Sequence, residues 1–351
     1  MADFLPPVPS NPPFPAAERR TAAGAPAQAE AAPDGTGAAR NGKDQPKKGK
    51  GKDEPKKGKD KKGKRRDKPK KGKGKDKKGK GKKGRKGGTK AERSDKYALY
   101  QRSVQAPDAD IEFFDQVFER LHGRKPTTLR EDFCGCALTC CEWVRTRPEN
   151  RAWGVDLDPE PLAWGREHNL SRLDEEQRAR VTLIRGDVRE ARRDPKVEVV
   201  AAQNFSFCIF KRREDLKGYF AAAREGLVDG GIFVLDIFGG PESIAPAEDE
   251  TEHKGFSYIW DQKSYDAINN EIQCAIHFSF KDGSRLEDAF TYDWRLWTIR
   301  ELKELLEEVG FRRADAYWEG CDEDGEGNGE FTLQDHADQE DAWIAYVVGV
   351  K

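Results

Sequence analysis

Short apolar runs alternate with amphipathic segments along the chain from residue 128 onwards. The runs that predict strands lie at residues 128–133, 152–156, 181–184, 197–202 and 232–235. Segments between them carry apolar residues at helical spacing, as in the stretch 214–228. This β-α-β-α succession is typical of the α/β class and predicts a mainly parallel sheet with helices on both faces.

The pattern changes between residues 256 and 297. Extended segments are predicted there at 256–260, 272–280 and 289–294. The sequence Lys281-Asp282-Gly283-Ser284 between two of them predicts a hairpin turn. We therefore expect a small antiparallel insertion of two or three strands before the last helix.

The remaining elements complete the predicted sheet. Apolar residues at helical spacing predict helices over 109–121, before the first strand, and over 299–309. Two late strands are expected at 311–318 and 343–350, separated by an acidic, glycine-rich loop at 322–330. With the five earlier strands they make a sheet of seven.

The first ninety residues have a different composition. Residues 1–40 are rich in Pro and Ala, and residues 41–89 repeat Lys and Gly with no aliphatic or aromatic side chain besides proline. Ordering such a segment costs roughly 1–2 kcal/mol per residue, with no hydrophobic burial in return. We therefore expect a disordered basic arm at 1–90 and one folded domain at 91–351.

The charge of the chain divides at the same place. Residues 1–90 hold 29 Lys and Arg against 10 Asp and Glu, while residues 91–351 hold 34 against 54. A basic arm of net charge +19 thus precedes an acidic body of net charge −20. Such an arm binds phosphate backbones in a salt-dependent, sequence-independent way. RNA or another polyanion is therefore a candidate partner of residues 43–90.

Several classes of protein are disfavoured by the sequence. No run of about 18 apolar residues is present, so we expect no membrane-spanning helix. The first residues lack a basic region followed by an apolar one, so we expect no secretory signal. The seven cysteines, four of them within 134–141, favour reduced thiols and a cytoplasmic location over a disulfide framework.

Each predicted strand of the parallel sheet ends in polar residues. These strand ends are Glu131/Asp132, Asp156, Asp187, Asn204 and Asp236. Parallel strands bring such ends to one edge of a sheet, where the ligands of open α/β sheets bind. The sequence therefore predicts a ligand site at this edge.

The segment Glu131-Asp132-Phe133-Cys134-Gly135-Cys136-Ala137 follows the first strand. Its acid and central glycine match an acid-x-Gly-x-Gly-x-Gly loop, whose bare backbone lets a cofactor lie close, although Phe133 and Ala137 replace the outer glycines. Asp156 closes the second strand about twenty residues later, and Arg185-Gly186-Asp187-Val188 closes the third. On these motifs, residues 95–351 resemble the class I S-adenosylmethionine-dependent methyltransferases.

The resemblance implies a Rossmann-like, seven-stranded, mostly parallel sheet with S-adenosylmethionine as the cofactor. It places Asp156 at the ribose hydroxyls and Asp187 at the adenine amino group. The cofactor-binding residues that it implies are Glu131, Asp132, Cys134, Gly135, Asp156, Leu157, Asp187, Val188, Asn204 and Phe205. Asp158 is interpreted as a helix cap, because Pro159 follows it.

Two local motifs allow other interpretations. The cysteines at 134, 136, 140 and 141 are close together, but a structural zinc site draws on a second, distant ligand pair, so we expect no metal. Asn204-Phe205-Ser206-Phe207 has both ends of the Asn-x-x-aromatic motif with which amino-directed nucleic-acid methyltransferases hold a flipped base. It lacks the prolines of that motif.

The function expected from the resemblance is methyl transfer from S-adenosylmethionine to an acceptor. One hypothesis is a small molecule or amine, enclosed by the aromatic residues of the 256–297 insertion. A second is RNA or a ribosomal component, with the basic arm as a tether, and a third is a non-catalytic protein that keeps the cofactor fold. No catalytic residue is assigned, although Asp236, Tyr258 and Tyr265 are candidates.

Overall fold

The computed structural model describes residues 88–190, 194–321 and 327–351. The predicted basic arm at 1–90 lies outside the described residues except for its last three, and so does 322–326 of the predicted acidic loop. The division into an arm and a body at residue 90 stays a prediction. Among the described residues, no helix is long and apolar enough to cross a membrane.

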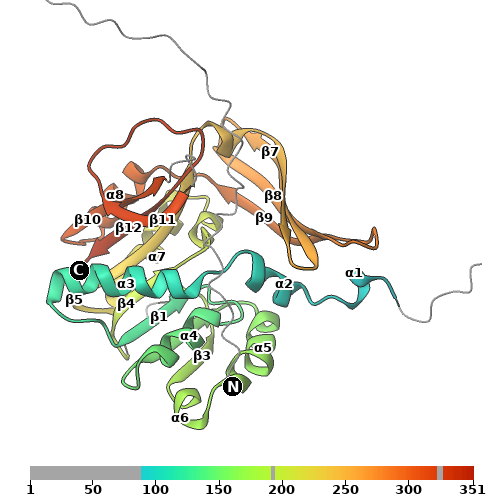
Figure 1. Ribbon diagram of the computed structural model, residues 1–351. Helices are drawn as coiled ribbons and strands as arrows, with labels where there is room; N and C mark the ends of the chain where they lie inside the picture. The colour runs from blue at the N-terminus through green and yellow to red at the C-terminus, as the bar shows by residue number, and fades with distance from the viewer. Residues whose placement is uncertain (1–87, 191–193, 322–326) are drawn as a thin grey trace, which may run out of the picture. The chain divides into compact units, whose positions relative to one another are not determined.

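An eight-stranded sheet forms the centre of the described part, with strand order β11-β10-β12-β5-β4-β1-β2-β3 (Figure 1). Its strands are β1 (Thr128–Asp132), β2 (Arg151–Asp156), β3 (Val181–Arg185), β4 (Val197–Ala202), β5 (Leu227–Gly239), β10 (Arg313–Cys321), β11 (Gly327–Leu333) and β12 (Trp343–Val350). The five strands from β5 to β3 are parallel, and β12, β10 and β11 pair antiparallel to their neighbours. The predicted α/β class and mostly parallel sheet are confirmed.

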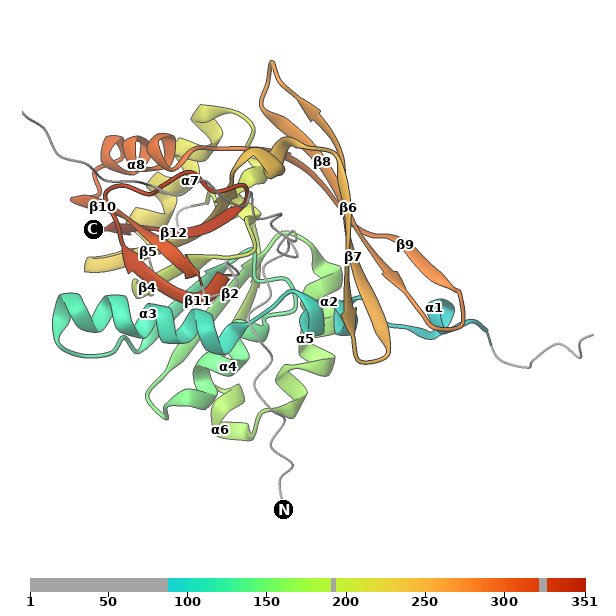
Figure 2. The ribbon, with the colours of Figure 1, turned by 45° about the horizontal axis from the view of Figure 1, so that its top comes forward.

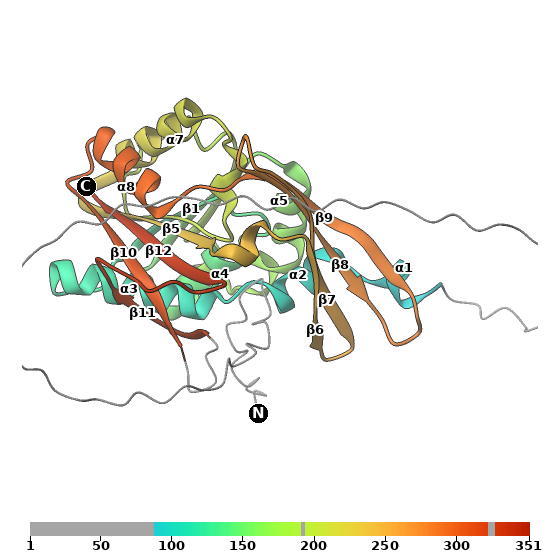
Figure 3. The same cartoon turned by 90° about the horizontal axis from the view of Figure 1, so that it is seen from above.

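Helices cover both faces of this sheet because successive strand residues point to opposite sides. Val199 and Ala201 face a core formed with α3, α4 and α5, whereas Val200 and Ala202 face a core formed with α7 and α8. Figure 3 shows α3 and α4 on one side of the sheet and α7 and α8 on the other. These helices are α3 (Pro107–His122), α4 (Leu138–Thr146), α5 (Pro159–His168), α7 (Arg213–Glu225) and α8 (Ile299–Glu308).

A second, four-stranded antiparallel sheet lies between β5 and α8 in the chain (Figure 2). It consists of β6 (Ala247–His253), β7 (Phe256–Asp266), β8 (Glu271–Ser279) and β9 (Arg285–Arg295). The predicted turn at 281–284 joins β8 to β9, with Gly283 at φ 81°. The insertion has one strand more than predicted, because β6 is polar and its side chains are mostly exposed, so it lacks an apolar signature.

Aromatic side chains connect the two sheets. The ring of Phe205, in the loop after β4, lies 4.6 Å from that of Phe238 in β5 and 6.4 Å from that of Trp294 in β9. Lys211 adds ion pairs from the loop after β4 to Glu271 and Asp293 of the antiparallel sheet. Both sheets therefore contribute to one hydrophobic core.

Two parts of the central sheet differ from the sequence-based prediction. β5 begins at Leu227 and continues through the glycine pair at 230–231, before the predicted strand at 232–235. An irregularity in the β4–β5 register, between Val197 and Val199, accommodates these glycines. β11 occupies part of the predicted loop at 322–330, because an exposed edge strand containing glycine has no apolar periodicity to reveal it.

Two short helices precede α3. They are α1 (Lys90–Arg93) and α2 (Lys96–Ser103). The indole N–H of Trp164 in α5 donates to the carboxylate of Asp95, the cap of α2, at 2.6 Å, and the Tyr97 ring lies 5.7 Å from that of Trp164. Tyr97 and Tyr100 also contact Phe290 of β9. Helix α2 therefore contacts both the helical layer and the antiparallel sheet.

Candidate functional site

The carboxyl ends of the parallel strands meet at one edge of the central sheet. In the parallel register, Asp132 lies beside Val155, Asp156 beside Arg185, and Ala202 beside Leu235. The polar residues predicted at these strand ends are therefore brought together, as expected. The loops that follow β1, β2 and β4 form the candidate site.

The loop after β1 has an unusual backbone at all three positions where the motif calls for glycine. Phe133 has φ 57°, Gly135 has φ 50° and Ala137 has φ 56°. This left-handed conformation costs roughly 1–2 kcal/mol for a residue that has a Cβ atom. The loop thus keeps the conformation of a glycine-rich loop although two of its glycines are replaced.

Gly135 is the open point of this loop. A Cβ atom built on Gly135 would meet no atom within 4 Å, so the space beside its backbone is free. Behind the loop, a Cβ on Gly165 of α5 would come within 2.4 Å of the carbonyl oxygen of Cys136, so only glycine permits this approach. The loop is therefore packed closely against α5 at Cys136 and has open space beside Gly135.

Asp156 connects the first two loops. Its Oδ2 accepts a hydrogen bond from the main-chain N–H of Gly135 at 2.8 Å, and its Oδ1 accepts from that of Asp158 at 2.8 Å. Burial raises the pKa of the Asp156 carboxyl, against the lowering effect of these N–H donors. The next residue, Leu157, is 65% exposed, which is high for a large apolar side chain.

Asp158 acts as the cap of α5. Its Oδ1 accepts from the main-chain N–H of Glu160 at 2.9 Å, and Pro159 occupies the first helical position. The interpretation of Asp158 as a cap is confirmed.

The adjacent acids Glu131 and Asp132 point into different environments. Glu131 accepts from the main-chain N–H of Cys140 in the first turn of α4 at 3.0 Å, and burial raises its pKa to about 7. Asp132 is held by a two-pronged ion pair with Arg130, both contacts at 2.9 Å, and by the hydroxyl of Tyr219 at 3.0 Å. Glu131 therefore links the loop after β1 to the start of α4, whereas Asp132 belongs to a buried polar cluster with Arg130 and Tyr219.

Cys134, Asp187 and Val188 occupy the surroundings of the loop. Cys134 is buried, and its Sγ would lie 2.8 Å from a Cβ on Gly154 of β2. Asp187 is paired with Arg189 at 2.7 Å, and hydrogen bonds from that side chain lower the pKa of Asp187. Val188 is buried in the core.

The loop after β4 is also strained. Asn204 and Phe205 have φ 58° and 57°. Their main-chain N–H groups donate to the carboxylate of Asp236 in β5, at 2.6 and 2.9 Å. Burial raises the pKa of Asp236 to about 8, although both N–H donors act in the opposite direction.

A pocket with three carboxyl groups lies beside this loop. This acid-lined pocket is formed by Val104, Ala106, Ala109, Asp110, Gln203, Asn204, Phe205, Asp236, Glu319, Gly329, Phe331, Ile344 and Tyr346. The Oδ1 of Asp110 accepts from Gln203 Nε2 at 2.9 Å and from the Tyr346 hydroxyl at 2.8 Å. Burial raises the pKa of Asp110 to about 6. The Oε1 of Gln203 is buried without a hydrogen-bond partner among the described residues.

Sequence reasoning missed Asp110, Glu319 and Tyr346 as members of a site. Asp110 lies in the first turn of α3, where an acid is ordinarily explained by the helix dipole. Glu319 and Tyr346 lie on β10 and β12, whose pairing was not predicted in register. The available signal was the polar pair Gln203-Asn204 at the end of a fully buried strand.

The aromatic residues of the insertion are mainly core residues, and two of them, Phe256 and Trp297, line the edges of two different pockets. These residues are Phe256, Tyr258, Trp260, Trp294 and Trp297, and all are 2–4% exposed. They pack into the core that both sheets share. The reason is that the antiparallel sheet needs an apolar face of its own to dock.

Six of the seven cysteines are buried thiols that form no disulfide among the described residues, and Cys321 is exposed. Burial raises the pKa of Cys134 and Cys140, which keeps these thiols protonated. Within 88–190, 194–321 and 327–351, no group of three or more His, Cys, Asp or Glu side chains is arranged to hold a metal ion.

No family model matches the sequence, and no curated protein is similar to it in sequence. The structure is similar to an S-adenosylmethionine-dependent methyltransferase from Clostridium acetobutylicum, with 16% identity, a TM-score of 0.51, and coverage of 72% of this chain and 96% of that one. It is also similar to DesVI of Streptomyces venezuelae, with 19% identity, a TM-score of 0.53 and coverage of 72% and 95%.

A third similar structure is CalS10, an amino pentose methyltransferase from Micromonospora echinaspora with S-adenosylmethionine bound. Its identity is 16%, its TM-score is 0.51, and the match covers 71% of this chain and 95% of that one. The described domain therefore has the fold of S-adenosylmethionine-dependent methyltransferases.

Proposed function

We propose that this protein is an S-adenosylmethionine-dependent methyltransferase. The observation that carries the proposal is the loop after β1, which keeps three left-handed residues and is tied through Gly135 to Asp156. A backbone strained at Phe133 and Ala137 persists only where the surrounding structure holds it, and such strain is concentrated at functional sites. The shared fold supports the same conclusion.

The residues at the strand ends fit this cofactor. The free space beside Gly135 suits the methionine end, and the Asp156 carboxylate is an acceptor for two ribose hydroxyls. The exposed side chain of Leu157 offers an apolar surface for the adenine ring, with Asp187 and the main chain of Val188 at its edge.

Four other predicted residues retain a role in the proposed cofactor site, and one does not. Glu131 and Cys134 support the loop from its buried side, and Asn204 and Phe205 border the place where the methyl group would be transferred. Asp132 is assigned a structural role instead, because its carboxylate is used by Arg130 and Tyr219.

The chemistry required of the chain is mainly positioning. When bound, S-adenosylmethionine supplies a methyl group that its sulfonium already makes electrophilic. The loops after β1 and β4 would hold the acceptor nitrogen or oxygen in line at about 3–3.5 Å, and such proximity supplies much of a rate enhancement. The buried aromatic residues Phe205, Phe238 and Trp294 would exclude water there.

The acid-lined pocket favours a small molecule with an amine as the acceptor. Asp110, Asp236 and Glu319 surround it without a cationic residue among its lining, and Gln203 adds an unused carbonyl oxygen. An ammonium or amine N–H would satisfy that acceptor and lower the mutual repulsion of the carboxylates. In its ionised form, whose fraction rises as the pH approaches the pKa of about 8, Asp236 is suited to accept the proton that the nitrogen loses.

RNA methylation is the second candidate, and the basic arm favours it. Residues 43–90 would bring the acidic body to a polyanion that the body itself repels. A non-catalytic role is the third alternative, and only activity measurements separate it from the first two.

The test is incubation of the full-length protein with isotopically labelled S-adenosylmethionine and cell extract, separated into metabolites, RNA and protein. Mass spectrometry should find the labelled methyl group on amines in the metabolite fraction. Label only in RNA would support the second candidate. A protein that binds the cofactor but labels no fraction would support the non-catalytic one.

A further inference from the structure

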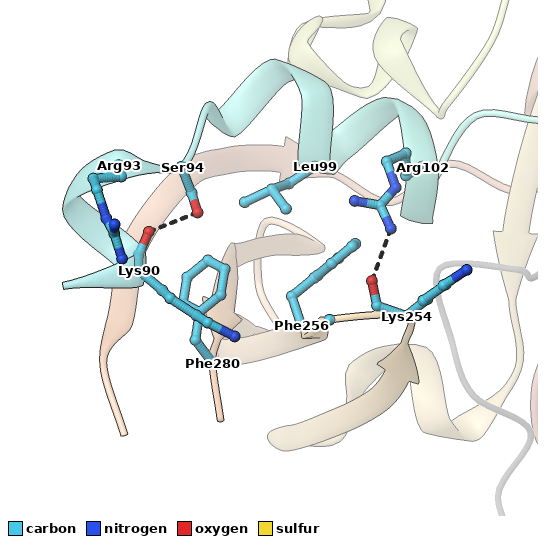
Figure 4. A pocket seen from close by; sticks show the side chains of 9 residues that line it. Lys90, Arg93, Ser94, Leu99, Arg102, Lys254, Phe256 and Phe280 are labelled. Carbon is cyan, nitrogen blue, oxygen red and sulfur yellow. Dashed lines mark hydrogen bonds between the residues drawn. The ribbon is translucent and has the colours of Figure 1, made fainter. Parts of the chain in front are cut away.

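A second pocket lies at the start of the described chain, and its polar side chains are nearly all cationic. It is lined by Lys90, Arg93, Ser94, Leu99, Arg102, Lys254, Gly255, Phe256 and Phe280, and we call it the cationic pocket. Its walls come from α1 and α2, the β6–β7 turn and the residue after β8. Figure 4 shows one pair of cations, Lys90 and Arg93, at one end and the other pair, Arg102 and Lys254, at the opposite end.

None of these four cations forms an ion pair with a carboxylate of the described residues, and no described Asp or Glu lines the pocket. Two acids of the neighbouring segments accept other hydrogen bonds: Glu92 accepts from the main-chain N–H of Thr89 in the capping box of α1, and Asp282 accepts from Ser284 and from the main-chain N–H of Lys90. These bonds, together with the charge of Lys90, lower the pKa of Asp282 to about 2. Four cations that share a pocket and form no ion pair with a described carboxylate are unexpected on a body of net charge −20.

The pocket holds one of its cations in a fixed position. The guanidinium of Arg102 lies 4.8 Å from the centre of the Phe256 ring and donates to the carbonyl oxygen of Lys254 at 2.9 Å. His253 stacks on Phe256 at 5.1 Å, and burial together with the charge of Arg102 lowers its pKa. His253 is therefore neutral near pH 7 and does not add to the charge of the pocket.

The apolar floor of the cationic pocket strengthens the attraction between its cations and a bound anion. Leu99, Phe256 and Phe280 are buried side chains of the core, and they separate the two cation pairs. Apolar surroundings lower the local dielectric, so an anion bound there interacts more strongly than on an open surface. The Phe256 face is occupied by Arg102 and His253, so the pocket offers charge and not a stacking surface.

We propose that the cationic pocket binds the phosphodiester backbone of single-stranded RNA. Two cation pairs at opposite ends of the pocket offer contacts to more than one phosphate of the same chain. The pocket also begins at Lys90, four residues after Lys86 in a segment with 29 Lys and Arg. A ligand that contacts both the arm and the pocket is a long polyanion, and the negative charge of the rest of the body favours its contact with these four cations. This inference does not rest on the methyltransferase function.

The test measures binding of a labelled 12-nucleotide oligouridylate to the full-length protein by fluorescence anisotropy between 50 and 300 mM NaCl. The variants are Lys90→Ala with Arg93→Ala, and Arg102→Ala with Lys254→Ala. Each pair removes two phosphate contacts, so we expect about tenfold weaker binding near 0.1 M salt. The slope of log K against log salt should fall in magnitude by about 1.4.

The matched control is Arg166→Ala with Arg172→Ala, which removes two exposed cations that form no ion pair with a described carboxylate. This control should leave affinity and slope unchanged. Arg102→Lys with Lys254→Arg keeps the charge and should bind like the wild type, which separates loss of charge from misfolding. Pocket variants that bind RNA as the control does would overturn the proposal. So would a pocket that is needed for phosphatidylserine vesicles but not for RNA.

Discussion

The carboxylate of Asp156 accepts a hydrogen bond from the main-chain N–H of Gly135 at 2.8 Å, which joins the loops after β1 and β2. The same carboxylate accepts from Asp158 with its other oxygen, so it orders both loops before any ligand arrives. A site whose parts are already held in place loses less entropy when a ligand binds. This pair of residues is therefore the centre of the proposed cofactor site.

Replacing Asp156 should affect the cofactor far more than replacing its neighbour. Asp156→Ala removes two charge-assisted hydrogen bonds to the ribose, and we expect affinity for S-adenosylmethionine to fall about 100-fold. Asp158→Ala removes the cap of α5 and should cost about 1 kcal/mol of unfolding free energy with little change in affinity. Calorimetric titration and urea denaturation measure the two effects. Equal losses of affinity would refute the separate roles.

The backbone of the loop can be tested at Gly135 and Ala137. Gly135→Ala places a Cβ in free space at φ 50°, so it should cost about 1 kcal/mol of stability and a larger loss of cofactor affinity. Ala137→Gly relieves the strain at φ 56° and should leave affinity within about twofold of wild type. Urea denaturation and cofactor titration of both variants check this. If Gly135→Ala binds the cofactor as tightly as the wild type, the loop is not the contact surface.

The buried acids predict a pH dependence of stability. Folding raises the pKa of Asp236 to about 8 and of Asp110 to about 6, so the folded state penalises their ionised forms. The contribution of these two carboxyl groups to the free energy of unfolding is complete below about pH 4. It is lost as the pH rises towards 8, by up to about 1.4 kcal/mol per pH unit for each proton. Urea denaturation should thus show falling stability from pH 5 to 8.

Two variants isolate the origin of this dependence. Asp236→Asn cannot ionise and should flatten the fall in unfolding free energy between pH 6 and 8. Asp338→Asn, at a fully exposed position, should reproduce the wild-type curve. A wild-type stability that rises over this range would mean that Asp236 is ionised in the folded protein.

Asp132 is predicted to act in stability and not in cofactor binding. Arg130→Met leaves its carboxylate buried without its ion pair, and we expect a loss of about 3–5 kcal/mol. Tyr219→Phe removes one hydrogen bond and should cost about 1–2 kcal/mol. The folded fraction of Tyr219→Phe should bind S-adenosylmethionine as the wild type does. A tenfold weaker titration of that variant would return Asp132 to the cofactor site.

The positions of the parallel strands along the chain could be predicted because their apolar runs are short, buried and separated by helical segments. β4 matches the predicted range 197–202 at both ends, since it is buried along its whole length. β6 and β11 could not be predicted, because both are exposed strands whose residues alternate little between apolar and polar. Their pairing with β7 and β10 is a tertiary property.

In the candidate site, the place of Asp156 at the end of β2 and the capping role of Asp158 before Pro159 could be predicted from the sequence. The site was not predictable where its geometry depends on the backbone conformation. Phe133 and Ala137 read as departures from the glycine motif, yet both adopt the left-handed conformation that the motif needs. Asp132 read as a ligand because its packing against Tyr219, 87 residues later, leaves no trace in the local sequence.

The most direct test of the account is a calorimetric titration of the full-length protein with S-adenosylmethionine. The account predicts saturable binding of one molecule per chain, retained in Asp158→Ala and strongly weakened in Asp156→Ala. Wild-type protein that is folded by circular dichroism and yet gives no binding heat at two temperatures would contradict it.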